Sequence, residues 1–159
     1  SNKFLAVNDM ILFAALGMFF KAASWSIAFI FLAKGESKLF FWNELITNIY
    51  LLALNLTGYS IYGLTGLGIS FLISYLLYLV QVFTISKIRY KFEFTVEFNK
   101  VFFPQLILAI LCFIIIKFVQ TPQMYFLGSI IILISFIFSL DRLNKKLNLQ
   151  EMLSKYFNR

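Results

Sequence analysis

Residues 106–118 read LILAILCFIIIKF, and residues 128–140 read GSIIILISFIFSL. Both stretches are apolar on every face of a helix, so neither leaves a polar side to turn toward water. The bias runs through the chain, because 61% of its 159 residues are hydrophobic and 13% are charged. An ordinary soluble domain has roughly 45–50% and 25%. The sequence therefore predicts an all-α bundle of helices whose solvent is lipid.

Five segments approach the length of about 20 apolar residues that a transmembrane helix requires, the last of them at the short end of the range. We expect these helices at about residues 10–33, 39–57, 64–86, 101–119 and 125–140. They predict a polytopic membrane bundle over residues 1–140, followed by a tail over residues 141–159. Pro104 is expected in the first turn of the fourth helix, where its missing N–H does little harm. Residues 87–98 alternate apolar with polar side chains, which fits either a short strand or a segment at the membrane interface.

The tail over residues 141–159 combines basic residues with an apolar face. Its apolar side chains fall near one side of a helix: Leu143, Leu147, Leu149, Met152, Leu153, Tyr156 and Phe157. This pattern predicts a basic amphipathic helix on the cytoplasmic membrane surface, drawn there by apolar burial and anionic lipid. A solubilising end without a role of its own is the alternative.

The basic residues divide the connections between the expected helices into two classes. Residues 34–38, residues 87–100 and the tail hold eleven of the fourteen Lys and Arg residues, whereas residues 58–63 and 120–124 hold none. The positive-inside rule places the basic connections and the C-terminus in the cytoplasm and the N-terminal end outside. Five crossings that start outside, in a chain that begins with Ser1, indicate a piece of a longer protein.

Several classes of chemistry are disfavoured by what the sequence lacks. It has no histidine, and its single cysteine, Cys112, lies inside an apolar run, so we expect no catalytic residue, metal site, disulfide or cofactor. The formal net charge of +7 lies in short segments between apolar runs rather than on an aromatic platform. Nucleic-acid binding is therefore not expected.

Lys21 is the most informative polar residue. It follows Met10 by eleven residues and precedes Lys34 by thirteen, which places it about 16 Å and 20 Å from the ends of its helix. A lysine near the bilayer midplane costs about 2.5–3.5 kcal/mol on insertion scales, so Lys21 is expected to face protein or a water-filled cavity. A purely structural pairing role is the alternative.

Small and polar residues continue this face on the first two expected helices. They are Gly17, Lys21, Ser24 and Ala28 on the first, and Glu44, Asn48, Leu51 and Asn55 on the second. A simple hairpin centred on Glu36 sets four pairs level: Gly17 with Asn55, Lys21 with Leu51, Ser24 with Asn48, and Ala28 with Glu44. Glu44 then lies about 10 Å along the helix from the level of Lys21, so no direct ion pair is expected. For Asn48 and Asn55 we favour a role in joining helices.

Two stretches carry a resemblance to a known family: GMFFKAASWSIAFIFLAKGESKLFFWNEL (17–45) and YGLTGLGISFLISYLLYLVQVF (62–83). They resemble the C-terminal half of bacterial polysaccharide biosynthesis membrane proteins. These are the O-antigen translocases, or Wzx-type flippases, of the multidrug/oligosaccharidyl-lipid/polysaccharide transporter superfamily. Residues 101–140 match only in hydropathy. Relatives often carry an acidic residue beside the first glycine of the first stretch, where this chain has Met18.

The resemblance implies a two-lobed carrier, with this chain as part of its C-terminal lobe. Such a carrier moves lipid-linked oligosaccharide, joined to undecaprenyl pyrophosphate, across the bacterial inner membrane by alternating access. Lys21 would counter phosphate charge and Trp25 would stack on a sugar. Ser24, Glu44 and Asn48 complete the candidate substrate-binding set, with Glu44 and Asn48 hydrogen-bonding to the cargo. The implied partners are the lipid-linked oligosaccharide, membrane lipids and an N-terminal lobe of the same protein.

Three other functions stay open. A carrier of the same superfamily would have a drug or another lipid as its cargo. A membrane glycosyl- or acyltransferase is disfavoured, because such enzymes usually place a histidine or a metal-binding carboxylate pair near the interface. A non-catalytic membrane scaffold is the third. We expect a transporter rather than an enzyme.

Overall fold

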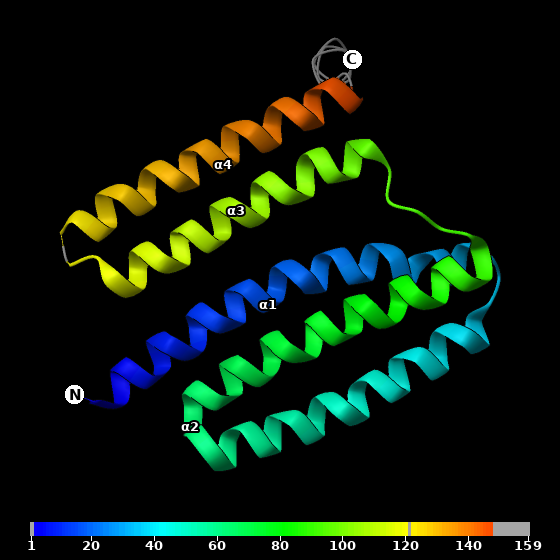
Figure 1. Ribbon diagram of the computed structural model, residues 1–159, viewed down its shortest axis with the longest axis horizontal. Coiled ribbons are helices and arrows are strands. Elements are labelled where there is room, and N and C mark those ends of the chain that lie inside the picture. Colours follow the sequence, from blue (N-terminus) through cyan, green and yellow to red (C-terminus); the bar gives the residue numbers. More distant parts are fainter. Residues whose placement is uncertain (1, 121, 148–159) are drawn as a thin grey trace, which may run out of the picture. The chain divides into compact units, whose positions relative to one another are not determined.

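The computed structural model describes residues 2–120 and 122–147, and nearly all of these residues are helical. The helices are α1 (Asn2–Ala33), α2 (Ser37–Tyr90), α3 (Val96–Phe118) and α4 (Gln123–Leu147) (Figure 1). All four are long and apolar enough to cross a membrane. The chain divides into two compact units, Ser1–Glu93 and Phe94–Arg159. The predicted all-α membrane bundle is thus confirmed for the described residues.

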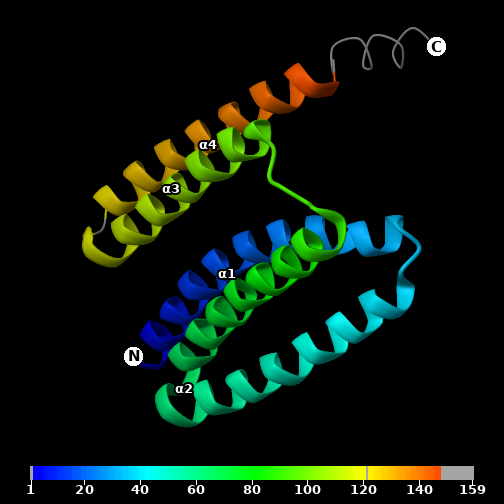
Figure 2. The same cartoon turned by 45° about the vertical axis from the view of Figure 1, so that its right-hand side comes forward.

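Helix α2 consists of two antiparallel arms, residues 37–62 and 64–90. The backbone leaves helical geometry at Gly63, with φ 59° and ψ −135°, and the chain reverses direction there (Figures 1 and 2). Glycine adopts such a positive φ without steric cost, because it has no Cβ. The Ser70 hydroxyl donates to the Asn55 side chain across the two arms at 2.7 Å. Each arm exceeds the ~20 residues needed for a crossing, so the arms correspond to the expected second and third helices.

Several helices begin earlier than hydropathy predicts. α1 begins at Asn2 rather than near Met10, and α3 begins at Val96 rather than near residue 101. Thr95 caps α3 by accepting a hydrogen bond from the backbone N–H of Phe98 at 3.2 Å. Pro104 therefore lies in the interior of α3 and not in its first turn. In the interior of a helix a proline removes one i→i−4 hydrogen bond, because it has no backbone N–H. Hydropathy indicates the part of a helix that lipid can cover. Polar residues N-terminal to that part belong to the same helix, so the helix begins earlier than the apolar run.

The segment over residues 87–98 contains no strand, so the strand interpretation is wrong. α2 ends at Tyr90, and Lys91 is its C-cap, with a left-handed backbone (φ 53°, ψ 36°). The N–H of Lys91 donates a hydrogen bond to the carbonyl of Ser86. At the far end of the chain, α4 runs on to Leu147, past the expected end at residue 140. The rest of the predicted amphipathic tail, residues 148–159, lies outside the described residues.

In the first unit, α1 packs most closely against the second arm of α2. A Cβ at Gly17 would lie 2.6 Å from the ring of Phe71, and one at Gly68 would lie 2.6 Å from the backbone oxygen of Met10. The core of this unit consists of buried apolar side chains: Leu12, Ala23, Ile27, Ala28, Phe31, Tyr75, Tyr78 and Val82. Asn55 bonds Ser70, which is next to Phe71, so Gly17 and Asn55 lie near the expected common level, while Gly17 itself contacts the second arm. Gly17 on α1 and Gly68 on the second arm thus allow a close approach of the two helices.

In the second unit, α3 and α4 form a hairpin joined by a polar bridge. The side chain of Gln105 donates to the Ser139 hydroxyl at 2.8 Å and accepts from the Ser135 hydroxyl at 2.7 Å. All residues of α3 are described, and none of them is buried. Such hydrogen bonds hold membrane helices together at about 0.6–2 kcal/mol each, where lipid gives no hydrophobic driving force between helices.

Two basic segments lie at the same end of the first unit, opposite the reversal at Gly63. Arg89, in the last turn of α2, forms an ion pair with Glu36 of the α1–α2 turn at 2.7 Å. Residues 34–38 and 87–91 are thereby brought together, as the predicted topology requires. The side of the membrane on which they lie stays a prediction.

Cysteines introduced singly at Lys38, Ser60 and Lys145 test this orientation. In a Cys112→Ser background, we expect an impermeant thiol reagent to label only the Ser60 position in intact cells, because basic connections stay in the cytoplasm. All three positions are exposed, so permeabilised cells should label at each one and serve as the control. Labelling at Lys38 or Lys145 with Ser60 protected would reverse the topology.

Candidate functional site

Lys21 lies between two aromatic rings. Its ammonium is 4.9 Å from the ring centroid of Trp25, one turn further along α1, and 5.1 Å from that of Tyr75 on the second arm of α2. An ammonium over an aromatic face gains about 0.5–1 kcal/mol when exposed and about 2 kcal/mol or more when desolvated. Within the described part of the chain, no ion pair joins Lys21 to Glu44.

A polar cluster joins the two arms of α2. It consists of Asn43, Glu44, Thr47, Tyr78 and Gln81. The Tyr78 hydroxyl donates to the Glu44 carboxylate, and the Gln81 amide donates to the Asn43 side chain at 2.7 Å. Asn43, Thr47 and Tyr78 are buried, and burial of polar groups is tolerated when they bond to one another. We call this group the inter-arm cluster.

Four residues of the inter-arm cluster were not predicted from the sequence. Asn43 and Thr47 are four residues apart, and Tyr78 and Gln81 are three apart, so each pair shares one helical face. That spacing is the signal that identifies them, since polar residues recurring on one face of an apolar helix seek a polar partner. The partner itself depends on how the two arms meet.

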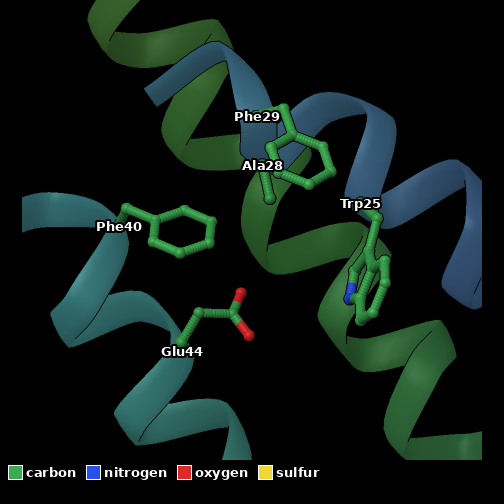
Figure 3. A pocket seen from close by; sticks show the side chains of 5 residues that line it. All are labelled: Trp25, Ala28, Phe29, Phe40 and Glu44. Carbon is green, nitrogen blue, oxygen red and sulfur yellow. The ribbon is translucent and has the colours of Figure 1, made fainter. Parts of the chain in front are cut away.

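A pocket of about 140 Å³ lies beside this cluster, between α1 and the first arm of α2. Trp25, Ala28, Phe29, Phe40 and Glu44 line it (Figure 3). The rings of Phe29 and Phe40 stack with centroids 6.4 Å apart, and the carboxylate of Glu44 lies between Phe40 and Trp25 (Figure 3). A cavity of about 150 Å³ holds benzene. The pocket is close to that size, and its lining combines aromatic rings with one carboxylate.

The structure brings three of the five sequence-predicted residues together. Lys21 contacts Trp25, and Trp25 and Glu44 line the same pocket. Ser24 is fully buried, and its hydroxyl donates to the carbonyl of Phe20 at 2.6 Å. Asn48 is exposed and donates to the backbone carbonyl of Glu44 at 2.8 Å. Ser24 and Asn48 thus bond within their own helices and are not at the pocket, because hydroxyls and amides in helices readily bond the carbonyl four residues back.

The described residues contain no group of three or more His, Cys, Asp or Glu side chains that could hold a metal ion. No protein family, curated protein or solved structure matches the chain. The fold and the site define a class, an α-helical membrane protein with a lysine, a carboxylate and an aromatic pocket within its spanning helices.

Removing the Tyr78 hydroxyl should lower the stability of the protein. Tyr78→Phe leaves the Glu44 carboxylate without its donor, and we expect a loss of about 1–2 kcal/mol in the free energy of unfolding. Thermal unfolding in detergent measures the change. Tyr62→Phe is the matched control, because Tyr62 is 70% exposed and should change stability by less than about 0.5 kcal/mol. Equal unfolding temperatures of the two variants would show that the hydrogen bond from Tyr78 to Glu44 does not stabilise the packing of the two arms.

Proposed function

We propose that this chain is part of one lobe of a carrier that moves lipid-linked oligosaccharide, of the undecaprenyl pyrophosphate type, across the bacterial inner membrane by alternating access. The observation that carries the proposal is the position of the Lys21 ammonium. It lies in the middle of the candidate span Val7–Ala33, next to the ring that borders the pocket. In the described part of the chain it contacts aromatic rings rather than a carboxylate.

The chemistry of the cargo matches these groups. A pyrophosphate with its sugar chain must pass about 30 Å of hydrocarbon, so it requires a polar, preferably cationic site near the midplane. Lysine binds phosphate as a point charge. Lys21 would hold the pyrophosphate, and one helical turn away Trp25 would cover the face of a sugar ring. Glu44 would accept hydrogen bonds from sugar hydroxyls, because a carboxylate is an acceptor with several free lone pairs.

A carrier of this kind needs more helices than the chain provides. Alternating access opens one half of a carrier against the other around a central site. The missing half would be an N-terminal lobe of the same protein, as the resemblance of residues 17–45 and 62–83 implies. We propose a multi-pass protein of the inner membrane with its C-terminus in the cytoplasm.

A second candidate is an exporter of a drug or another lipid. It is favoured by the lining of the pocket, where Trp25, Phe29 and Phe40 surround one carboxylate. Aromatic faces beside a carboxylate suit an organic cation, because both attract positive charge. Lys21 argues against this cargo, since its ammonium lies against the same Trp25 ring and repels a second cation.

Deletion of the full-length gene distinguishes the candidates. The proposal expects loss of surface polysaccharide and accumulation of complete lipid-linked oligosaccharide in the inner leaflet. A drug exporter expects normal polysaccharide and increased drug sensitivity. A glycosyl- or acyltransferase expects an incomplete oligosaccharide that lacks one group. Normal polysaccharide with no accumulated intermediate would contradict the proposal.

A further inference from the structure

One end of the first unit gathers five exposed basic residues from three chain segments. They are Lys34 from the α1–α2 turn, Lys38 from the first turn of α2, and Lys87, Arg89 and Lys91 from the end of its second arm. The ion pair between Arg89 and Glu36 joins these segments at 2.7 Å, and the rings of Phe31 and Tyr90 lie 6.0 Å apart beneath it. We call these five residues the basic end.

The charge of the basic end is mostly uncompensated. Glu36 is the acidic residue between Lys34 and Lys38, and Arg89 already binds it. Within the described part of the chain, the side chains of Lys34, Lys38 and Lys91 have no ion pair or hydrogen bond. Three exposed ammonium groups at this end of the unit therefore lack an ion pair.

Exposed aromatic and apolar side chains border the basic end on its membrane side. Phe41 and Trp42 are 60% and 58% exposed, and they share a face of α2 with Lys38 at spacings of three and four residues. Trp42 lies four residues beyond Lys38, about 6 Å deeper along the helix. Ile88, beside Lys87, is 79% exposed. Lysine outside and tryptophan just inside is the arrangement found where the hydrocarbon meets the headgroups.

We propose that the basic end binds the headgroup of an anionic phospholipid, with the acyl chains running past Phe41 and Trp42. The phosphodiester supplies the negative charge that the free lysines lack, and the acyl chains cover the apolar side chains below them. A soluble acidic peptide or a nucleic acid would match the charge but not the exposed Trp42 and Ile88. This lipid site is separate from the pocket, and it does not depend on the identity of the cargo.

The two tryptophans of the chain make the site measurable. In a Trp25→Phe variant, Trp42 is the one fluorophore of its kind. The full chain is placed in vesicles of phosphatidylcholine and phosphatidylglycerol, with bromine on the acyl chains of one lipid at a time, because bromine quenches a neighbouring indole. We expect about fivefold enrichment of phosphatidylglycerol over phosphatidylcholine at Trp42, which corresponds to ~1 kcal/mol for a basic side chain near the membrane surface. The enrichment should vanish near 1 M salt, where the Debye length falls to about 3 Å.

Charge-removal variants locate the effect. Lys34→Gln with Lys38→Gln should abolish most of the enrichment, whereas Lys100→Gln with Lys117→Gln, in α3, removes the same charge and should leave it intact. In a Trp42→Phe variant, Trp25, which lies eight residues before the end of α1 at Ala33 and so deeper than Trp42, should show a smaller preference between the two lipids. Equal quenching by both lipids at low salt would overturn the proposal. A preference for phosphatidylglycerol that persists at high salt would also overturn the proposal. The salt dependence is measured on the protein with all its lysines, so it does not require a lysine variant to fold.

Discussion

A single methyl group at Gly66 is expected to force the two arms of α2 apart and to remove most of the protein from the membrane. A Cβ at this position would lie 1.8 Å from the backbone oxygen of Gly58 and 2.5 Å from its carbonyl carbon. Backbone atoms cannot rotate away as the end of a flexible side chain can, so the arms themselves must move. The Ser70–Asn55 hydrogen bond beside this crossing would break. We expect Gly66→Ala to lower the free energy of unfolding by about 3 kcal/mol, the upper part of the usual range for overpacking.

Gly128→Ala is the matched control for this prediction. Nothing lies within 4 Å of a Cβ at Gly128, which is inside α4. Alanine is a better helix former than glycine, so this change should raise stability by about 0.5–1 kcal/mol. Thermal unfolding in detergent and abundance in the membrane are the two measurements. If Gly66→Ala accumulates and unfolds like the unchanged protein, the arms do not cross at Gly58 and Gly66.

The spanning segments could be predicted from the sequence because membrane insertion depends on the length of an apolar run. With that criterion, four of the five expected segments lie within a described helix, including the two arms that meet at Gly63, and the segment 101–119 exceeds α3 by one residue. The criterion could not place the helix ends. Polar residues can form the first turns of a helix, as they do in α1 and α3. The apolar run is therefore shorter than the helix that contains it. Pro104 was placed in the wrong turn for the same reason.

The candidate site was predictable on α1 and, for Glu44, on the first arm of α2, but not on the second arm. Lys21 and Trp25 share a face through their spacing of four residues, and this requires no knowledge of the rest of the fold. Tyr75, the second ring against Lys21, lies more than fifty residues away in sequence. Its position depends on the close approach of α1 to the second arm at Gly17 and Gly68. Hydropathy contains no information on that approach, so the sequence paired α1 with the first arm alone.

Lys21→Leu is expected to abolish export while leaving the protein in the membrane. Insertion scales assign a lysine at the helix centre about +2.5 to +3.5 kcal/mol and a leucine about −0.3 to −0.6 kcal/mol. The change also removes the two ring contacts of Lys21, which are worth about 0.5–1 kcal/mol each when exposed and about 2 kcal/mol or more when desolvated. Lys21 is half-buried, so values between these two apply. The free energy of unfolding should therefore stay nearly constant or rise. The loss of the cation from the site should nevertheless remove the binding of pyrophosphate.

Two further substitutions separate charge from packing. Lys21→Arg keeps the positive charge with a different donor geometry, so it should retain part of the export activity. Lys117→Leu removes a lysine from the last turn of α3, which belongs to the second unit and is not among the residues of the proposed cargo site, and should leave export intact. Membrane abundance, thermal stability in detergent and surface polysaccharide are measured for each variant of the full-length protein in a deletion strain.

The combination of the three measurements decides between two roles of Lys21. Normal export by Lys21→Leu would contradict a role in binding cargo, because no other lysine lies near the middle of α1. Loss of export together with loss of the protein from the membrane would instead make Lys21 a structural residue whose ammonium holds Trp25 and Tyr75 in place. Loss of export at normal abundance and stability is the expected outcome. Normal abundance and stability would show that Lys21 is not needed for folding, so the loss of export would reflect a loss of cargo binding.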